Sequence, residues 1–221
     1  MKGLFITGTD TDVGKTYISC LIAKQLRAID INVVPRKPVE SGCIKEGDEL
    51  TPADASALKK AAKYSGDLGI VCPFRFEQAT SPQRAARISG TLLKLDQLRD
   101  ACLREVDAEN DYLLVEGAGG YYSPLCEDGL NADFAQSLDL PVLLVAEDKL
   151  GCINQVLLSV EAINSRGLKL LAIILNETRP GPDNTLVNNF EDISALVTCP
   201  IFFNQFHSNK VSPELIKTIL T

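Results

Sequence analysis

Residues 8–16 read GTDTDVGKT, and this stretch decides how the rest of the chain is interpreted. It follows the apolar run Leu-Phe-Ile at 4–6 and precedes a segment, 15–29, whose apolar residues recur at helical spacing. A strand, a glycine-bearing loop and a helix in this order form the setting of a phosphate-binding loop. Glycines let the backbone wrap a polyphosphate, and the unpaired N–H groups of the first helical turn point at it. Lys15 is expected to reach the outer phosphates and the Thr16 hydroxyl to hold a Mg²⁺ ion, so the stretch predicts a nucleoside triphosphate ligand.

The loop departs from the common pattern in its length. Four residues usually separate the first glycine from Gly-Lys-Thr, whereas five separate Gly8 from Gly14 here. An ordinary strand-to-helix turn that carries Gly-Lys-Thr by chance is the alternative. The flanking strand and helix patterns favour the nucleotide site.

The composition indicates one globular domain over 1–221. With 221 residues, 45% hydrophobic and 23% charged, the chain is long enough to bury a full core and does not have the composition of a disordered segment. No run approaches the ~18 uninterrupted apolar residues that span a bilayer, and no leader is recognised, so we expect a cytoplasmic protein without a membrane segment. The formal net charge of −7 disfavours a nucleic-acid partner, which it would repel.

Cysteine and histidine form no catalytic or metal-binding pattern. The seven cysteines are widely spaced and include no Cys-x-x-Cys pair, so we interpret them as small buried residues in a reducing compartment. His207 is the only histidine, and no serine lies in a Gly-x-Ser-x-Gly elbow. The chemistry is therefore expected to proceed without a histidine relay.

Strand and helix patterns alternate along the chain. Apolar runs that predict buried strands lie near 3–7, 31–35, 112–116, 141–146, 170–175 and 200–203. Segments with helical spacing lie near 15–29, 52–64, 92–106, 131–139, 152–165 and 184–197, and Ser212-Pro213 begins a short C-terminal helix. This alternation predicts an α/β fold of the P-loop NTPase kind, a parallel sheet covered by helices on both faces. Ligands on such folds bind at the carboxyl ends of the strands.

Charged residues follow two of these strands. Lys37 follows the second strand, where it is suited to stabilise charge on a transferring phosphoryl group, although a surface lysine is the alternative. Glu116 ends the predicted strand at 112–116, a position where nucleotide hydrolases place an acid associated with Mg²⁺. Asp54 has two interpretations. It is either a Mg²⁺ ligand or the partner in a helix cap that begins with Thr51.

Three further segments carry weaker signals. Residues 117–120, Gly-Ala-Gly-Gly, would let the backbone approach a phosphate or substrate closely. The helix start at 149–154 offers free N–H groups suited to a carboxylate, although an unoccupied helix start is equally consistent. Asn176 ends the 170–175 strand, where its amide could read an adenine edge or could simply form a turn.

Taken together, these segments closely resemble dethiobiotin synthetase. The resemblance rests on four stretches in order: GTDTDVGKT at 8–16, KPVESG at 37–42, VEGAGG at 115–120 and LGCIN at 150–154. Thr80-Ser81-Pro82 also looks like the loop that covers the substrate in this family. The resemblance implies an ATP-dependent cyclo-ligase of biotin synthesis, a homodimer that uses Mg²⁺. Its substrates would be 7,8-diaminononanoate, CO₂ and ATP. A carbamate would be phosphorylated to a carbamic–phosphoric anhydride, and ring closure would then release phosphate.

The resemblance also implies roles for individual residues. Lys37 and Lys15 would act in catalysis, and Thr16, Asp54 and Glu116 would hold Mg²⁺. The substrate would contact Thr11, Lys37, Ser41 and the helix start at Gly151, Cys152 and Asn154, which the other subunit would supply. The nucleotide would be bound by Asp12, Val13, Gly14, Lys15, Thr16, Tyr17, Asp54, Glu116, Gly117, Ala118, Gly119, Asn176 and Glu177.

Two points stay open. Residues 203–208 contain no proline, whereas the last adenine-contacting loop of the family usually carries one, so base selectivity is not determined. A partitioning-type P-loop ATPase, which switches partners, is the alternative function. Such proteins carry a second lysine five residues before the loop lysine, and Asp10 occupies that position here.

Overall fold

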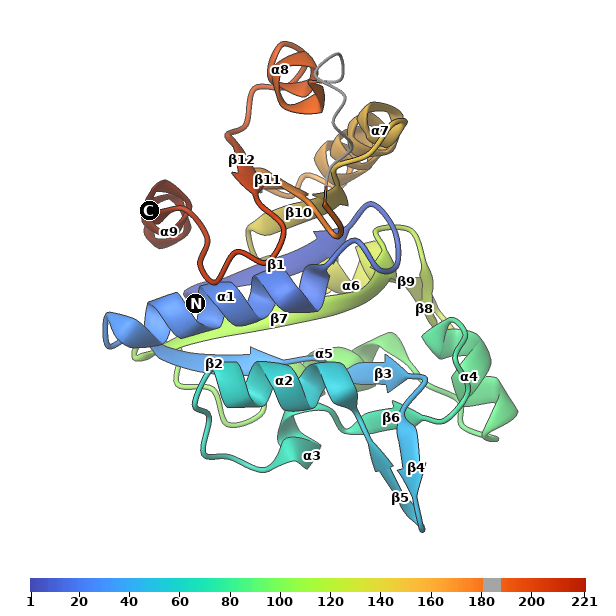
Figure 1. Cartoon of the computed structure of the whole chain (residues 1–221). Helices are drawn as coiled ribbons and strands as arrows, with labels where there is room; N and C mark the ends of the chain where they lie inside the picture. Colours follow the sequence, from blue (N-terminus) through green and yellow to red (C-terminus); the bar gives the residue numbers. More distant parts are fainter. Residues whose placement is uncertain (181–187) are drawn as a thin grey trace.

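The central sheet is entirely parallel and has the strand order β12–β11–β10–β1–β7–β2 (Figure 1). This computed structural model describes residues 1–180 and 188–221. All the predicted strands are confirmed within the described residues: β1 (Gly3–Gly8), β2 (Asn32–Arg36), β7 (Asp111–Gly120), β10 (Val142–Glu147), β11 (Leu170–Asn176) and β12 (Ile201–Asn204).

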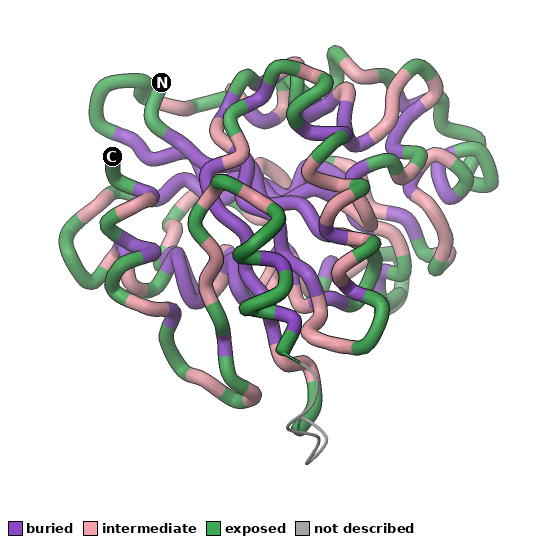
Figure 2. The backbone as a smooth tube through the Cα atoms, turned by 90° about the horizontal axis from the view of Figure 1, so that it is seen from above, coloured by how far each residue is buried: buried purple, intermediate pink, exposed green. Residues whose placement is uncertain are grey.

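Helices cover both faces of the sheet, as the uninterrupted apolar runs predicted. In β1, Leu4 and Ile6 face a core built with α1 (Lys15–Ala28) and α9 (Pro213–Leu220). Phe5 faces the opposite core, where it packs edge-on against Phe134 with ring centroids 5.6 Å apart. That second core is built with α5 (Leu95–Leu103), α6 (Asn131–Leu138) and α7 (Cys152–Ser165). The backbone of the sheet is accordingly buried at the centre of the molecule (Figure 2). Alternate side chains of each strand therefore stabilise separate layers.

The remaining predicted helices are also present, with shorter bounds. They are α2 (Ala53–Ala61) and α8 (Asn189–Ser194), and residues 184–187 of the predicted 184–197 helix lie outside the described residues. The predicted cap of α9 is confirmed, because the Ser212 hydroxyl accepts a hydrogen bond from Leu215 N at 3.2 Å. No helix in the described part of the chain combines the length and apolar character needed to cross a membrane.

Several short elements between 39 and 130 were not predicted. β3 (Val39–Ser41) pairs with β6 (Phe74–Phe76) beside the main sheet. The others are β4 (Ile44–Glu46), β5 (Glu49–Thr51), α3 (Leu68–Val71), α4 (Pro82–Ile88), β8 (Pro124–Cys126) and β9 (Gly129–Leu130). Segments of two to seven residues are too short to show a hydrophobic period, so no sequence pattern distinguishes them from loops.

Candidate active site at the carboxyl edge of the sheet

The loop between β1 and α1 has the geometry expected of a phosphate-binding loop. Gly14 occupies the position before the first helical residue with φ +92°, a conformation that glycine adopts without strain. No side chain caps the start of α1, so its first N–H groups face the loop without a side-chain acceptor. A site for anionic phosphate oxygens is formed where these N–H groups converge.

Lys15 begins α1 and folds back over this loop. Its Nζ donates to the carbonyl oxygen of Asp10 at 2.7 Å, and only 7% of the residue is exposed. Burial, together with the nearby positive charge of Lys37, lowers the pKa of Lys15 to about 8. A phosphate group placed beside this ammonium would supply the negative charge that its surroundings lack.

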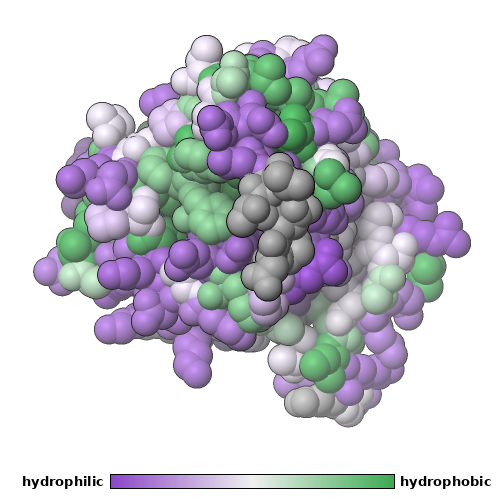
Figure 3. All heavy atoms as spheres, turned by 45° about the horizontal axis from the view of Figure 1, so that its top comes forward, coloured by the Kyte–Doolittle hydropathy of each residue, from purple (hydrophilic) through white to green (hydrophobic). Residues whose placement is uncertain are grey.

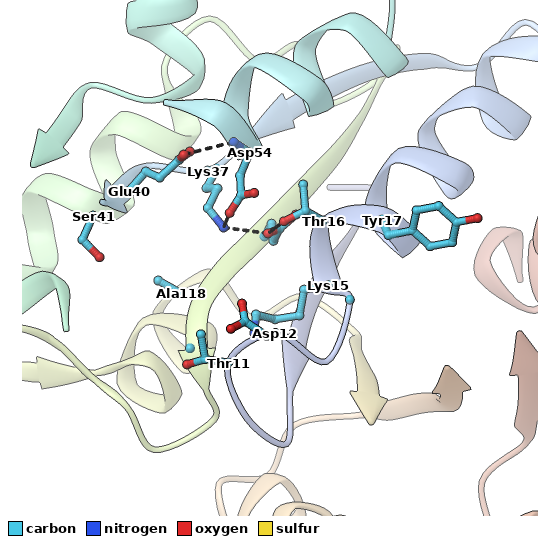
Figure 4. Close-up of a pocket in the computed structure, with 13 residues that line it drawn as sticks. Thr11, Asp12, Lys15, Thr16, Tyr17, Lys37, Glu40, Ser41, Asp54 and Ala118 are labelled. Carbon is cyan, nitrogen blue, oxygen red and sulfur yellow. Dashed lines mark hydrogen bonds and ion pairs between the residues drawn. The ribbon is translucent and has the colours of Figure 1, made fainter. Parts of the chain in front are cut away.

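Lys37 lies between two carboxylates. Its Nζ is 2.6 Å from Oε1 of Glu116 and 3.0 Å from Oδ2 of Asp54. The Thr16 hydroxyl donates to the same Glu116 oxygen at 2.6 Å. These side chains come from α1, the end of β2, α2 and β7, and Thr16, Lys37 and Asp54 point toward one another (Figure 4). The sheet thus brings the predicted catalytic lysine and the predicted metal-binding residues into one cluster.

Lys37 and Glu116 are strongly shielded from water. Lys37 is 4% exposed and Glu116 is 1% exposed. Burial alone would lower the pKa of Lys37, but the carboxylates of Glu116 and Asp54 outweigh it and hold that pKa above its usual value. Lys37 is therefore a permanent cation near neutral pH, which is the state needed to stabilise developing negative charge.

The donor set suits Mg²⁺. Oε2 of Glu116 is buried and has no hydrogen-bond partner among the described residues, a costly arrangement for a carboxylate oxygen. Asp54 is half-exposed beside it, and the Thr16 hydroxyl completes a set of hard oxygen donors. Mg²⁺ usually takes one or two carboxylates together with phosphate oxygens and water, rather than a cage of protein ligands. Three oxygen-bearing side chains at the end of a phosphate-binding loop match that preference.

Thr51 does not cap α2, so the helix-cap interpretation of Asp54 is wrong. The N-cap residue is Pro52, whose side chain makes no capping hydrogen bond. The cap comes instead from Glu40 on β3, whose Oε1 and Oε2 accept from Asp54 N at 3.0 Å and Ala55 N at 2.9 Å. The Asp54 carboxylate therefore points to Lys37, and it is available to the cation cluster that Asp54 forms with Thr16, Lys37 and Glu116.

Two adjoining cavities open over the cluster. The first has a volume of about 350 Å³. Its lining comprises Thr11, Asp12, Gly14, Lys15, Thr16, Tyr17, Lys37, Glu40, Ser41, Asp54, Glu116, Ala118 and Gly119. The second, of about 600 Å³, shares six of these residues and extends to Ser123 and the loop 79–82. Ser41 ties that loop to the site, since its hydroxyl donates to Thr80 O at 2.6 Å. A phosphate-binding chamber therefore opens directly into a second chamber.

The family comparisons agree with this geometry. Residues 2–202 match the model of a family described as an AAA domain. The ATP-dependent dethiobiotin synthetase BioD of Ruthia magnifica is 37% identical over 222 aligned positions, which cover 100% of this chain and 99% of that protein. The protein of the same name from Yersinia pestis bv. Antiqua is 41% identical over 81% of this chain and 74% of its own length. This chain belongs to the dethiobiotin synthetase family.

Solved structures similar to this dethiobiotin synthetase family member confirm the P-loop NTPase fold. The cell division protein FtsY of Thermotoga maritima is 16% identical with a TM-score of 0.56, covering 100% of this chain and 68% of that one. The MinD cell division protein of Aquifex aeolicus is 15% identical with a TM-score of 0.54, covering 99% and 86%. At this level of identity the likeness shows the fold alone.

Several predicted residues of the family member lie outside both cavities. Val13 is buried in the core beneath α1, and Gly117 packs its Cα against the Asn131 amide. Gly151, Cys152 and Asn154 form the start of α7, which lines neither chamber; Cys152 is fully buried while Gly151 and Asn154 are exposed. Within one chain, this helix start is therefore not joined to the phosphate site.

Asn176 is engaged within the protein. It is 2% exposed, its Nδ2 donates to Val13 O at 3.0 Å, and its Oδ1 accepts from Asn204 Nδ2 at 2.8 Å. Glu177 accepts from Phe206 N at 3.0 Å through Oε2. Asn176 thus connects the end of β11 to the last residue of β12 and supports the phosphate loop, while Glu177 connects to the segment after β12. Reading of adenine by Asn176 stays a prediction that requires the exchange of both amide bonds.

Sequence reasoning assigned no role to Glu40 or Ser123. Glu40 lies inside the KPVESG stretch, three positions after Lys37, but in a strand of three residues that the sequence pattern does not reveal, so no sequence signal marks its role. Ser123 accepts from Gly120 N at 2.8 Å and so supports the glycine loop from outside that motif. This support of the glycine loop depends on a turn at 120–123 that the sequence pattern does not predict.

Proposed function

We propose that this chain is an ATP-dependent dethiobiotin synthetase, which converts 7,8-diaminononanoate, CO₂ and ATP into dethiobiotin, ADP and phosphate. The observation that carries the proposal is the position of Lys37. Its ammonium group lies in the wall of the phosphate chamber, between the carboxylates of Glu116 and Asp54, and Asp54 lines the second chamber as well. Membership of the family supplies the identity of the reaction.

All the nucleophiles come from the substrates. One amine of the diamine adds to CO₂ and forms a carbamate, whose oxygen then takes the terminal phosphoryl group. The second amine attacks the resulting carbamic–phosphoric anhydride, closes the cyclic urea and releases phosphate. No serine, cysteine or histidine nucleophile is needed, which suits a chain whose cysteines are free and largely buried and whose single histidine is exposed.

The protein contributes position and charge. Lys15 and the N–H groups after Gly14 bind the outer phosphates, and Asp12 and Tyr17 line the same chamber. Thr16, Asp54 and Glu116 would hold Mg²⁺, which would supply neutralisation of charge on the phosphate oxygens. Lys37 stabilises the charge that develops on the carbamate and on the transferring group.

The second chamber takes the head of the diamine. Thr11, Ser41, Ala118 and Gly119 line both chambers, so a substrate held there lies beside the terminal phosphate. Gly119 has φ +71°, and a Cβ at that position would lie 2.5 Å from Ser123 Oγ, so only glycine allows the backbone this approach. The backbone at Ala118 and Gly119 completes the wall.

The start of α7 binds the substrate carboxylate across a homodimer. Gly151 and Asn154 are exposed residues at a helix start, a position suited to an anion, yet they line neither chamber of their own chain. Leu150, Leu158 and Tyr122 are 86%, 60% and 51% exposed. Hydrophobic residues also lie among hydrophilic ones on the face that Figure 3 presents. Apolar side chains of this size next to a site are typical of a surface that a partner covers. The dimer is expected in the cytoplasm.

Adenine lies toward the segment after β12. Tyr17 donates its hydroxyl to Ser208 O, and Glu177 holds Phe206 N, so this segment adjoins the phosphate chamber. Asn176 lies beside the start of this segment. It contacts adenine after its amide has released its hydrogen bonds to Val13 and Asn204. Replacement Asn176→Ala should raise the KM for ATP more than the KM for GTP. An equal rise would leave Asn176 a structural residue.

Incorporation of labelled bicarbonate tests the proposed reaction. Purified protein is incubated with ATP, Mg²⁺, the diamine and isotopically labelled bicarbonate, and the product is analysed by mass spectrometry. The proposal expects one labelled carbon in a cyclic urea, formed together with ADP. A partitioning-type ATPase would release ADP without any product that carries the label, and that result would overturn the proposal.

A further inference from the structure

The first turn of α2 is capped by a side chain from a separate strand. Pro52 stands at the N-cap position and has no side-chain acceptor to offer. Glu40, on β3, supplies both oxygens instead: Oε1 accepts from Asp54 N at 3.0 Å (Figure 4), and Oε2 accepts from Ala55 N at 2.9 Å. Glu40 is only 6% exposed, so the contact is shielded from competing water.

This contact determines where Asp54 stands. The backbone N–H of Asp54 is bound to Glu40, while the side chain of the same residue lies 3.0 Å from Lys37 Nζ. A shift of the first turn would therefore carry the Asp54 carboxylate away from Lys37 and Glu116. Because β3 begins two residues after Lys37, one short segment positions both the lysine and the helix that carries its partner.

Charge favours the same arrangement. The N-terminal turn of a helix carries partial positive charge, which stabilises an anion placed against it. Glu40 also adds to the negative field around Lys37, together with Glu116 and Asp54. Burial raises the pKa of Glu40, while its two backbone hydrogen bonds and Lys37 act in the opposite direction. A neutral residue of the same shape would bind the N-terminal turn of α2 less strongly and would not attract Lys37 by charge.

We propose that Glu40 is a positioning residue for the metal site: its carboxylate holds the first turn of α2 so that Asp54 stands in the cation cluster. The inference rests on the proposed function only for the identity of the ion as Mg²⁺. Both Glu40 oxygens bind backbone N–H groups, so Glu40 acts through Asp54. Loss of such a supporting contact typically weakens metal affinity about 10–100-fold.

The test measures metal binding directly. Mn²⁺ is titrated into the protein with ADP and followed by electron paramagnetic resonance, and no diamine or bicarbonate is present. Glu40→Ala and the milder Glu40→Gln should weaken Mn²⁺ binding, by about 10–100-fold for alanine, and leave ADP binding without metal unchanged. Adding Pro52→Ser to Glu40→Ala should recover most of the loss, because serine at the N-cap accepts the N–H that Glu40 held. Pro52→Ser alone is the matched control and should bind Mn²⁺ normally.

Two results would overturn the inference. In the first, the Glu40 variants melt at lower temperature but bind Mn²⁺ as the unaltered protein does, which leaves Glu40 a purely structural cap. In the second, the double variant regains its melting temperature without regaining Mn²⁺ affinity, which means that Glu40 acts on the ion by another route. If Glu40→Ala does not fold, the Mn²⁺ affinity and melting temperature of Glu40→Gln decide between the same outcomes. A wrong substrate assignment does not affect these titrations, so the two proposals fail separately.

Discussion

The ammonium nitrogen of Lys37 lies 2.6 Å from Oε1 of Glu116, although the two residues are 79 positions apart in the chain. Strand register explains the contact. β2 and β7 run parallel, and Arg36 pairs with Val115, so the next residue of each strand reaches the carboxyl edge at the same level. Glu116 also accepts from Thr16, which joins the phosphate loop to this pair. A cation, one acid and the start of α1 are thereby held together by the sheet itself.

Replacement of Lys37 should affect turnover far more than nucleotide binding. In Lys37→Met, kcat is expected to fall by about 10²–10³, the usual cost of removing one group that stabilises transition-state charge, with a small change in the KM for ATP. Steady-state kinetics measure both. Lys45→Met is the matched control, since Lys45 is an exposed lysine whose contact with Glu77 spans 3.8 Å. A near-normal kcat in Lys37→Met would remove Lys37 from the mechanism.

The same variant should be less stable and should respond to metal. Glu116 is 1% exposed, and loss of Lys37 leaves its carboxylate without a cation, which costs about 3–5 kcal/mol in other buried pairs. Mg²⁺ between Glu116 and Asp54 would replace part of that charge. We therefore expect Mg²⁺ to raise the denaturation midpoint of Lys37→Met more than that of the unaltered protein. Equal responses in urea titrations would argue against a metal at Glu116.

Replacement of Asp54 separates its metal role from helix capping. Asp54→Asn keeps the backbone N–H that binds Glu40, so the free energy of unfolding should change little. The Mg²⁺ concentration for half-maximal activity should rise by about tenfold or more, as expected when one of few carboxylate ligands is lost. Thr51→Val is the control, because Thr51 does not cap α2, and it should alter neither quantity. A large loss of stability in Asp54→Asn with normal Mg²⁺ dependence would restore the capping role.

Arg36 should be required for stability and not for binding. Its guanidinium is fully buried and donates from Nε to Cys102 O at 3.2 Å and from Nη2 to Arg104 O at 2.5 Å, at the end of α5. Lysine cannot make both bonds from one nitrogen in this geometry, and each lost bond to a charged group costs about 1.5–3 kcal/mol. Arg36→Lys should lower the free energy of unfolding by at least one such bond and leave KM values unchanged. Unchanged stability in a denaturant titration would contradict this assignment.

The cysteines should be inert in the folded protein. All seven are free, and five are buried. Burial raises the pKa of Cys102 to about 12 and of Cys126 to about 11, so almost no thiolate forms near pH 8. A thiol reagent should therefore react slowly in native buffer, first at the half-buried Cys20 and Cys199, and with all seven groups after unfolding. Rapid reaction of a buried cysteine would indicate a reactive thiol that this account does not contain.

The main sheet and its helices could be predicted because their apolar runs are long and continuous. β10 and β11 are buried on both faces, so every residue in them except the last of each strand is apolar, and the run is continuous. The phosphate loop, Lys37 and Glu116 could be predicted for a related reason. Residues at the carboxyl ends of parallel strands lie at the same edge of the sheet, whatever the length or structure of the segments that connect the strands.

The contacts around α2 could not be predicted. β3 has three residues and pairs with β6 across more than thirty intervening positions, so its location depends on tertiary packing. Local sequence rules placed the cap of α2 at Thr51, whereas a long-range acid, Glu40, makes it. The amide of Asn176 was likewise assigned from its position after a strand, and its bonds to Val13 and Asn204 depend on side-chain packing across the sheet edge.

Stoichiometric coupling of ATP use to the diamine tests the central claim most directly. Phosphate release by the purified protein is measured with ATP and Mg²⁺ in four mixtures, with and without 7,8-diaminononanoate and with and without bicarbonate. The account predicts rapid release only when both are present, with one phosphate formed for each dethiobiotin. Equal phosphate release without the diamine would contradict it.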